Sequence, residues 1–99
     1  MGCFVIQKES QLLGFVHYIY HFSTWTTGNY CYLQDLFIDM NQRAQGLGKQ
    51  LIEAVYSEAK KQECSRVYWL THEDNHIARK LYDQVADNVG FIQYRKNIN

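Results

Sequence analysis

The stretch Arg43-Ala44-Gln45-Gly46-Leu47-Gly48 separates two segments of different hydrophobic periodicity. Residues 32–38 before it form an apolar run of the kind found in β-strands, and residues 47–62 after it repeat apolar side chains at helical spacing. Two glycines therefore flank one apolar residue where a strand passes into a helix. The first backbone N–H groups of a helix have no intrahelical acceptor, and together they can hold a phosphate. This turn predicts an α/β fold with a candidate anion site.

Two familiar phosphate motifs do not fit this turn. A P-loop needs a glycine where Arg43 stands and Ser or Thr where Gln50 stands. A dinucleotide-binding fingerprint needs a third glycine, and Leu51 occupies that place. What remains is Arg-x-x-Gly-x-Gly, in which Arg43 adds a positive charge beside the free N–H groups. Two interpretations stay open: an anion site, or a turn that only needs two conformationally permissive glycines.

The residues before the turn predict an antiparallel half of the sheet. Strands are expected at 3–7, 13–22 and 30–39, because these segments are rich in aromatic and β-branched residues. Residues 8–11 form a polar turn, so the first two strands are expected to make a hairpin.

The residues after the turn predict a helix and then a parallel strand. The helix over 47–62 has a mostly apolar stripe, formed by Leu47, Leu51, Ala54, Val55, Glu58 and Ala59. The short apolar run 66–71 is typical of a central parallel strand.

A second helix and a last strand are expected to complete the chain. Asp74 or Asn75 can cap the helix, whose stripe continues to Val89, and Gly90 is a suitable stop after it. Residues 91–96 then read as a strand. The order strand, strand, strand, helix, strand, helix, strand predicts an α/β fold with a mixed sheet.

Composition limits the classes of function. The 99 residues suffice for one domain, and 46% hydrophobic content favours a folded core. A formal net charge of zero disfavours nucleic acid or a membrane surface as partner, and no apolar run is long enough for a membrane span. Three widely separated cysteines form neither a disulfide framework nor a zinc set, so we expect reduced thiols, no metal and a cytoplasmic location.

A second motif gives the turn a family context. The segment Asn75-His76-Ile77-Ala78-Arg79-Lys80-Leu81-Tyr82, followed by Gly90-Phe91, resembles the C-terminal signature of the GNAT superfamily of acyl-CoA-dependent N-acetyltransferases. The likeness runs from about residue 33 to residue 94 with motif order and spacing intact. The phrases at 32–37 and 68–75 are most similar to the branch related to histone and polyamine acetyltransferases.

The resemblance implies acetyl-CoA as cosubstrate and assigns roles to individual residues. Tyr82 would be the general acid that protonates the leaving thiolate, whereas its position alone favours a core aromatic on the helix stripe. Backbone groups of two strand residues would hold the pantetheine arm, the glycine turn would hold the pyrophosphate, and two residues of the second helix would face the coenzyme. These cofactor positions are Phe37, Ile38, Arg43, Ala44, Gln45, Gly46, Leu47, Gly48, Lys49, Asn75 and Ala78.

The group that takes the proton of the amine is left open. In some relatives a Glu on the strand before the turn has this role, and counting back from Arg43 places it near Tyr32 or Gln34. Asp35 is one residue off and is expected on the other face. Gln34, Asp35 and Glu73 are candidates for acceptor binding. His72 or water alone are further possibilities for the proton. His17 and His21 read as packing or surface residues rather than metal ligands.

The resemblance also implies that an opening strand and two helices are missing. The chain would be a single, N-terminally truncated domain over 1–99, or a fragment of a longer enzyme. An uncovered aromatic sheet face and an open edge predict a homodimer joined through the hairpin strands. Three functions follow: transfer of an acetyl group to a small-molecule or lysine amine, a degenerate relative that binds CoA without efficient turnover, or a structural dimer with no ligand.

Overall fold

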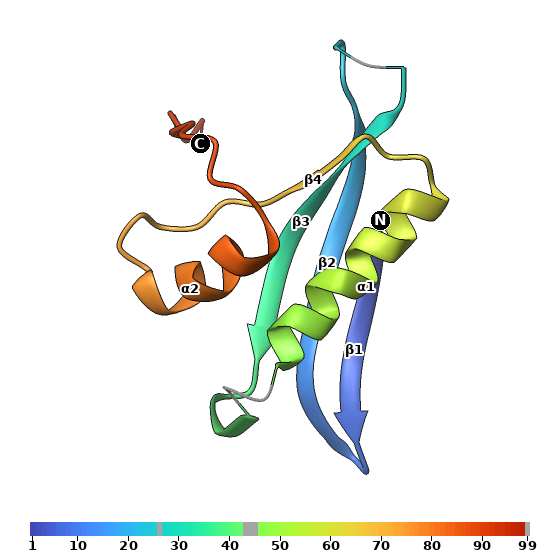
Figure 1. Cartoon of the computed structure of the whole chain (residues 1–99), viewed down its shortest axis with the longest axis vertical. Helices are drawn as coiled ribbons and strands as arrows, with labels where there is room; N and C mark the ends of the chain where they lie inside the picture. The colour runs from blue at the N-terminus through green and yellow to red at the C-terminus, as the bar shows by residue number, and fades with distance from the viewer. Residues whose placement is uncertain (26, 43–45, 99) are drawn as a thin grey trace.

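The computed structural model describes residues 1–25, 27–42 and 46–98. Three strands come first, followed by a short 3₁₀ turn, a helix, a fourth strand and a second helix (Figure 1). The elements in chain order are β1 (Gly2–Lys8), β2 (Gln11–Phe22), β3 (Asn29–Ile38), η1 (Met40–Gln42), α1 (Leu47–Lys61), β4 (Arg66–Tyr68) and α2 (His76–Val85). The mixed α/β architecture and the first three strands confirm the sequence prediction.

The four strands form one sheet in the order β1-β2-β3-β4. The first three strands are antiparallel, and β4 pairs parallel to β3 over Tyr30↔Arg66, Cys31↔Val67 and Tyr32↔Tyr68. A parallel connection needs a crossover, and α1 supplies it. The strand expected at 66–71 is therefore shorter than predicted and lies at the sheet edge rather than at its centre.

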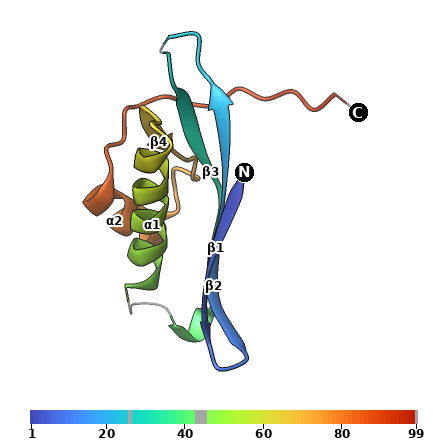
Figure 2. The same ribbon diagram turned by 90° about the vertical axis from the view of Figure 1, so that its right-hand side faces the viewer.

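The core lies between α1 and one face of the sheet. Figure 2 shows both helices on the same side of the sheet. Alternation along the strands turns Val16, Cys31 and Leu33 towards α1, where they meet Ile52 and Val55. Ile52 is fully buried although the predicted stripe omitted it, because the buried face of α1 is turned by about one position.

The last predicted strand, 91–96, is wrong. Residues 87–98 have neither helix nor strand, and the tail extends away from the sheet (Figure 2). Phe91 and Tyr94 are 89% and 91% exposed. Aromatic and β-branched residues favour a strand only when a neighbouring strand is available for pairing, and this tail has none among the described residues.

The end of α2 also differs from the prediction. The helix stops at Val85, with the extended Ala86 as its C-cap, rather than running on to Val89. Gly90 does adopt a left-handed φ of 84°, but it lies four residues beyond the cap, where its N–H donates to the Asn88 side chain. Within the described ranges, no helix is both long and apolar enough to cross a bilayer.

Candidate functional site

The pairing of β3 with β4 ends in the middle of the sheet. Tyr32 is the last residue of β3 that pairs with β4, yet β3 continues for six more residues beside β2. The chain after Tyr68 leaves the sheet and leads to α2 (Figure 1). The backbone of residues 33–38 therefore has a side without a paired strand in the described structure, and polar backbone groups there can bind an extended ligand.

Two predicted pantetheine-binding residues lie at the end of this opened strand. Phe37 projects from the face away from α1, is 43% exposed and stacks on Phe15 with a centroid distance of 5.3 Å. Ile38 points the other way and packs against the core. Their side chains thus fix the strand from both faces, which leaves the backbone as the part available to a ligand.

The start of α1 suits an anion. Gly46 is its N-cap in the left-handed conformation, with φ of 75°, and as a glycine it supplies no side-chain cap. Gln50 donates its N–H to the Gly46 carbonyl, so the preceding N–H groups have no acceptor within the helix. The first turn contains no acidic residue and carries Lys49, which matches the positive end of the helix dipole. Arg43, Ala44 and Gln45, also predicted to bind the pyrophosphate, lie outside the described residues.

The two glycines of the turn have different structural roles. A Cβ added at Gly46 would meet nothing within 4 Å, so this glycine is required by its backbone conformation and leaves open space around it. A Cβ added at Gly48 would come within 2.9 Å of Leu81 Cδ2. Gly48 therefore allows α1 and α2 to approach closely, a role that the spacing of the motif did not indicate.

The predicted ligand residues of α2 form its N-terminal cap. Asn75 accepts a hydrogen bond from the Ala78 N–H at 3.4 Å and donates to Thr71 Oγ1 at 3.5 Å. Arg79 donates to the Glu73 carbonyl at 2.6 Å, which ties the loop before the helix to its first turn. This network fixes where α2 starts, and with it the position of Tyr82 two turns later.

Aromatic neighbours hold the Tyr82 side chain in place. Its ring meets Trp69 edge-on, with centroids 5.3 Å apart and planes at 64°. Trp69 in turn lies beside Tyr56, whose hydroxyl donates to the Val85 carbonyl at 2.8 Å. Burial raises the pKa of Tyr82 above its usual value of 10. Its phenol therefore stays protonated across the neutral range, as a proton donor must.

The structure separates the three predicted acceptor residues. Gln34 is the extra residue of a bulge in β3, since Leu33 pairs with Tyr18 and Asp35 pairs with His17. The bulge places Asp35 on the face away from α1, and its Oδ2 lies 3.4 Å from His17 Nδ1. Glu73 lies in the loop before α2 instead. The sequence did not identify the His17–Asp35 pair, because the pairing depends on the register between two strands.

The remaining reactive groups offer no alternative centre. Cys31 is fully buried, and burial raises the pKa of its thiol to about 11, so the thiol stays protonated. The described residues contain no group of three or more metal-ligating side chains. An open surface hollow is lined by charged and polar residues of the β4–α2 loop and α2, but it lies outside the gap between β3 and β4.

Comparison with known proteins identifies the family. The model of the acetyltransferase (GNAT) family matches residues 1–86. The chain is 38% identical over 90 residues to a D-amino-acid N-acetyltransferase of Saccharomyces cerevisiae, covering 91% of this chain and 56% of that protein. It is 29% identical over 93 residues to the thialysine N-ε-acetyltransferase of Mus musculus, covering 89% of this chain and 54% of that protein. The chain thus spans about half the length of these relatives.

Solved structures show the same fold. An aminoglycoside acetyltransferase from a soil metagenomic sample, in complex with trehalose, superposes with a TM-score of 0.90 at 19% identity, covering 98% of this chain and 65% of that one. The aminoglycoside acetyltransferase AAC(6')-Iy, bound to a CoA bisubstrate analogue, superposes with a TM-score of 0.82 at 22% identity, covering 97% of this chain and 69% of that one. The chain belongs to the GNAT family of acetyltransferases.

Proposed function

We propose that this chain binds acetyl-CoA and transfers the acetyl group to a primary amine. The observation that carries the proposal is the gap that opens where β4 leaves β3 at Tyr68. The gap lies in the sheet, and the start of α1 and Tyr82 of α2 lie in the helix layer on one side of that sheet. Acetyl-CoA needs the same three: polar backbone for its arm, N–H groups for its pyrophosphate and an acid for its thiolate.

The residues present fit the cosubstrate. Gly46 leaves open space beside the first turn of α1, and Lys49 brings a cation there without an opposing acidic residue in that turn. Acetyl-CoA supplies an activated thioester. The chain would hold its pyrophosphate at residues 43–49, hold its arm along the backbone of Phe37 and Ile38, and donate a proton from Tyr82 to the departing sulfur.

Relatives guide the choice of acceptor. The names of the matched proteins specify D-amino acids, thialysine and aminoglycosides, all of which carry amino groups. We therefore propose an amine of a small molecule or of a lysine side chain as the acceptor. Asp35 is the acidic residue of β3 beside the gap and is the group suited to attract an ammonium.

Binding and turnover are tested separately. A hundredfold excess of acetyl-CoA over its Kd should raise the free energy of unfolding by about 2.7 kcal/mol, measured by thermal shift. Release of free CoA thiol over a panel of amines then measures transfer. The proposed cosubstrate is rejected if saturating acetyl-CoA leaves the melting temperature unchanged.

A CoA-binding protein without efficient turnover is the second candidate. Gln34 stands near the strand position at which the family resemblance implies a carboxylate. In addition, no described helix covers the face of the sheet opposite α1. Stabilisation by acetyl-CoA together with no thiol release for any amine would favour this candidate. Cofactor binding is common to both, so only the acceptor side distinguishes them.

A homodimer through the hairpin strands remains part of the proposal. β1 is an edge strand, and Val5 on its outer face is 56% exposed. Pairing of two β1 edges would satisfy these groups. The free thiols fit a reducing, cytoplasmic location. Light scattering at micromolar concentration should give twice the mass of the chain; the mass of a single chain would contradict this.

A further inference from the structure

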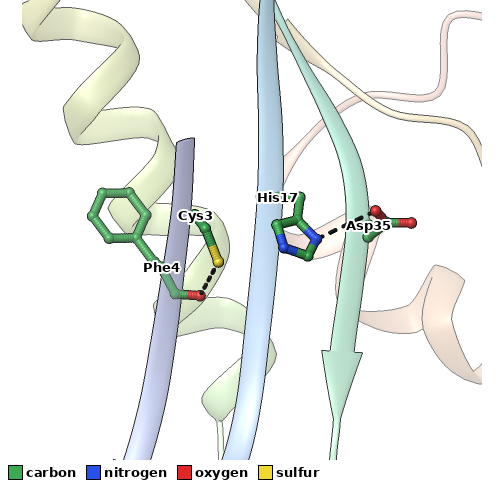
Figure 3. A network of polar contacts seen from close by, with 4 residues as sticks. All are labelled: Cys3, Phe4, His17 and Asp35. Carbon is green, nitrogen blue, oxygen red and sulfur yellow. Dashed lines mark hydrogen bonds and ion pairs between the residues drawn. The ribbon is translucent and has the colours of Figure 1, made fainter. Parts of the chain in front are cut away.

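Three neighbouring strands bring Cys3, His17 and Asp35 into one row on the face of the sheet opposite α1. Cys3 of β1 is paired with His17 of β2, and His17 is paired with Asp35 of β3. Figure 3 shows the His17 ring turned towards Asp35, while the Cys3 sulfur is turned towards the Phe4 carbonyl. Within this row, the side chains of His17 and Asp35 are in contact, with Nδ1 and Oδ2 3.4 Å apart.

The bulge at Gln34 creates this contact. Side chains alternate along a strand, so an unbroken β3 with Leu33 in the core would turn Asp35 towards α1 as well. The extra residue reverses the alternation, so that Leu36 and Ile38 return to the core and Asp35 faces outward. Bulges of this kind are frequent beside active sites because they redirect a side chain.

Asp35 lies nearer to the gap than His17 does. Asp35 lies on β3 three residues beyond Tyr32, where β4 has already separated from β3. His17 lies on β2, on the far side of Asp35 from β4. A cation that enters the gap from the outer face thus meets the carboxylate first and the imidazole second. Both side chains are about half exposed, so the imidazole can exchange protons with water.

The surroundings of His17 fix its ring without adding a competing charge. Phe15 lies 4.9 Å from the imidazole centroid and is itself stacked on Phe37. The Cys3 thiol is the titratable group on the β1 side, and Asp35 is the charged group on the β3 side. A neutral imidazole with its hydrogen on Nε2 keeps the lone pair of Nδ1, the nitrogen that faces Asp35, available for a proton.

We propose that Asp35 holds the ammonium of the acceptor and that His17 removes the proton which this amine must lose. The inference deepens the proposed function and rests on it. An ammonium R–NH₃⁺ and acetyl-S-CoA give R–NH–acetyl, CoA–SH and one proton. The amine nitrogen loses one proton to the Asp35 carboxylate, which passes it to His17 Nδ1, and the nitrogen lone pair then forms the C–N bond as the C–S bond breaks.

Once the C–N bond has formed, the nitrogen loses a second proton to solvent. Solvent in turn reprotonates the Tyr82 phenolate, which gave its proton to the sulfur. His17 returns its own proton to solvent after each turnover. Asp35 is the residue that touches the substrate, and His17 is a positioning and relay residue that acts through it. This arrangement supplies on β2 the proton acceptor that Gln34 cannot supply on β3.

The pair is tested first without turnover. Histidine ring resonances are recorded by NMR while 1,5-diaminopentane is added to the whole chain. The His17 resonances should move, because an ammonium at Asp35 changes the charge beside the ring, and the His21 resonances should stay. Asp35→Asn should abolish the movement. Unchanged His17 resonances in the unmodified chain would overturn the proposal whether or not the chain is an active enzyme.

Kinetics provide the second test, with His17→Gln as the variant. Gln can still hydrogen-bond to Asp35 but takes up no proton, so we expect kcat to fall about 100-fold, the lower end of the effect of a general base. The KM for the amine should change little, because Asp35 still binds the ammonium, whereas a purely structural defect would change both constants.

His21→Gln is the matched control. His21 lies on the same strand and face, but it contacts the Tyr68 hydroxyl at 2.6 Å instead of a carboxylate. It should keep both kcat and the KM for the amine. Full activity in His17→Gln would reject the relay while leaving the proposed function intact. If acetyl-CoA does not stabilise the unmodified chain against unfolding, the proposed function is rejected instead.

Discussion

Gly46→Glu is expected to weaken acetyl-CoA binding about 100-fold. A carboxylate here would sit beside the first turn of α1, where a pyrophosphate is proposed to bind and where Gly46 leaves open space. Two unit charges 5–6 Å apart repel by about 3 kcal/mol at an effective dielectric constant of 20. At a ligand concentration that stabilises the unmodified chain by about 2.7 kcal/mol, the variant should gain only about 0.4 kcal/mol.

The control for this variant is Gly46→Gln. Gly46 has a φ of 75°, so any side chain with a Cβ is strained there, and Gln has nearly the same shape as Glu. Both variants should therefore lose a similar amount of intrinsic stability, which melting without ligand measures. The difference between them in acetyl-CoA affinity isolates the charge. Equal affinities for the two variants would place the anion elsewhere.

Tyr82→Phe is expected to lower kcat by a factor of about 10² to 10⁴, the usual contribution of a positioned general acid. The phenylalanine ring can keep the edge-on contact with Trp69 at 5.3 Å, so the fold and acetyl-CoA affinity should change little. Thiol release at saturating amine measures the first quantity, and thermal shift with acetyl-CoA measures the second. A variant that turns over at the original rate would show that another group or water protonates the thiolate.

The pH dependence of Tyr82 follows from its burial. Because burial raises the pKa of this phenol above 10, the acid form persists through the whole neutral range and is lost only on the alkaline side. In a profile of rate against pH, loss assigned to Tyr82 should therefore appear at a higher pH than for a free phenol. Tyr56→Phe is the matched control: it removes a hydroxyl that bonds to the Val85 carbonyl, and should cost about 1 kcal/mol of stability without the loss of kcat.

Local patterns were sufficient for most of the fold. Helical spacing over 47–62 and the aromatic, β-branched runs before it predicted α1 and the first three strands, because hydrophobic periodicity reports directly on which face is buried. The tail at 91–96 has similar composition but forms no strand. A strand is completed by a neighbour distant in sequence, and composition says nothing about whether that neighbour is present.

The candidate site likewise has parts that are contiguous in sequence and a part that depends on strand register. The glycine turn and the Asn75–Tyr82 motif are each contiguous in sequence, so their resemblance to the family motifs could be seen without a structure. The contact between His17 and Asp35 depends on a single inserted residue at Gln34, which changes the side of the sheet that Asp35 occupies. A period-two reading places Asp35 on the wrong face, since one residue reverses every side chain that follows it.

The contact between Gly48 and Leu81 has a mechanical consequence. Gly48 lies in the first turn of α1, and Leu81 immediately precedes Tyr82 in α2, so the proposed anchor of the cosubstrate and the proposed acid are separated by one van der Waals contact and one peptide bond. Because a Cβ at Gly48 would clash with Leu81, the close approach of α2 to the start of α1 depends on this glycine. The packing of the two helices would therefore set the spacing between the proposed pyrophosphate site and the Tyr82 phenol.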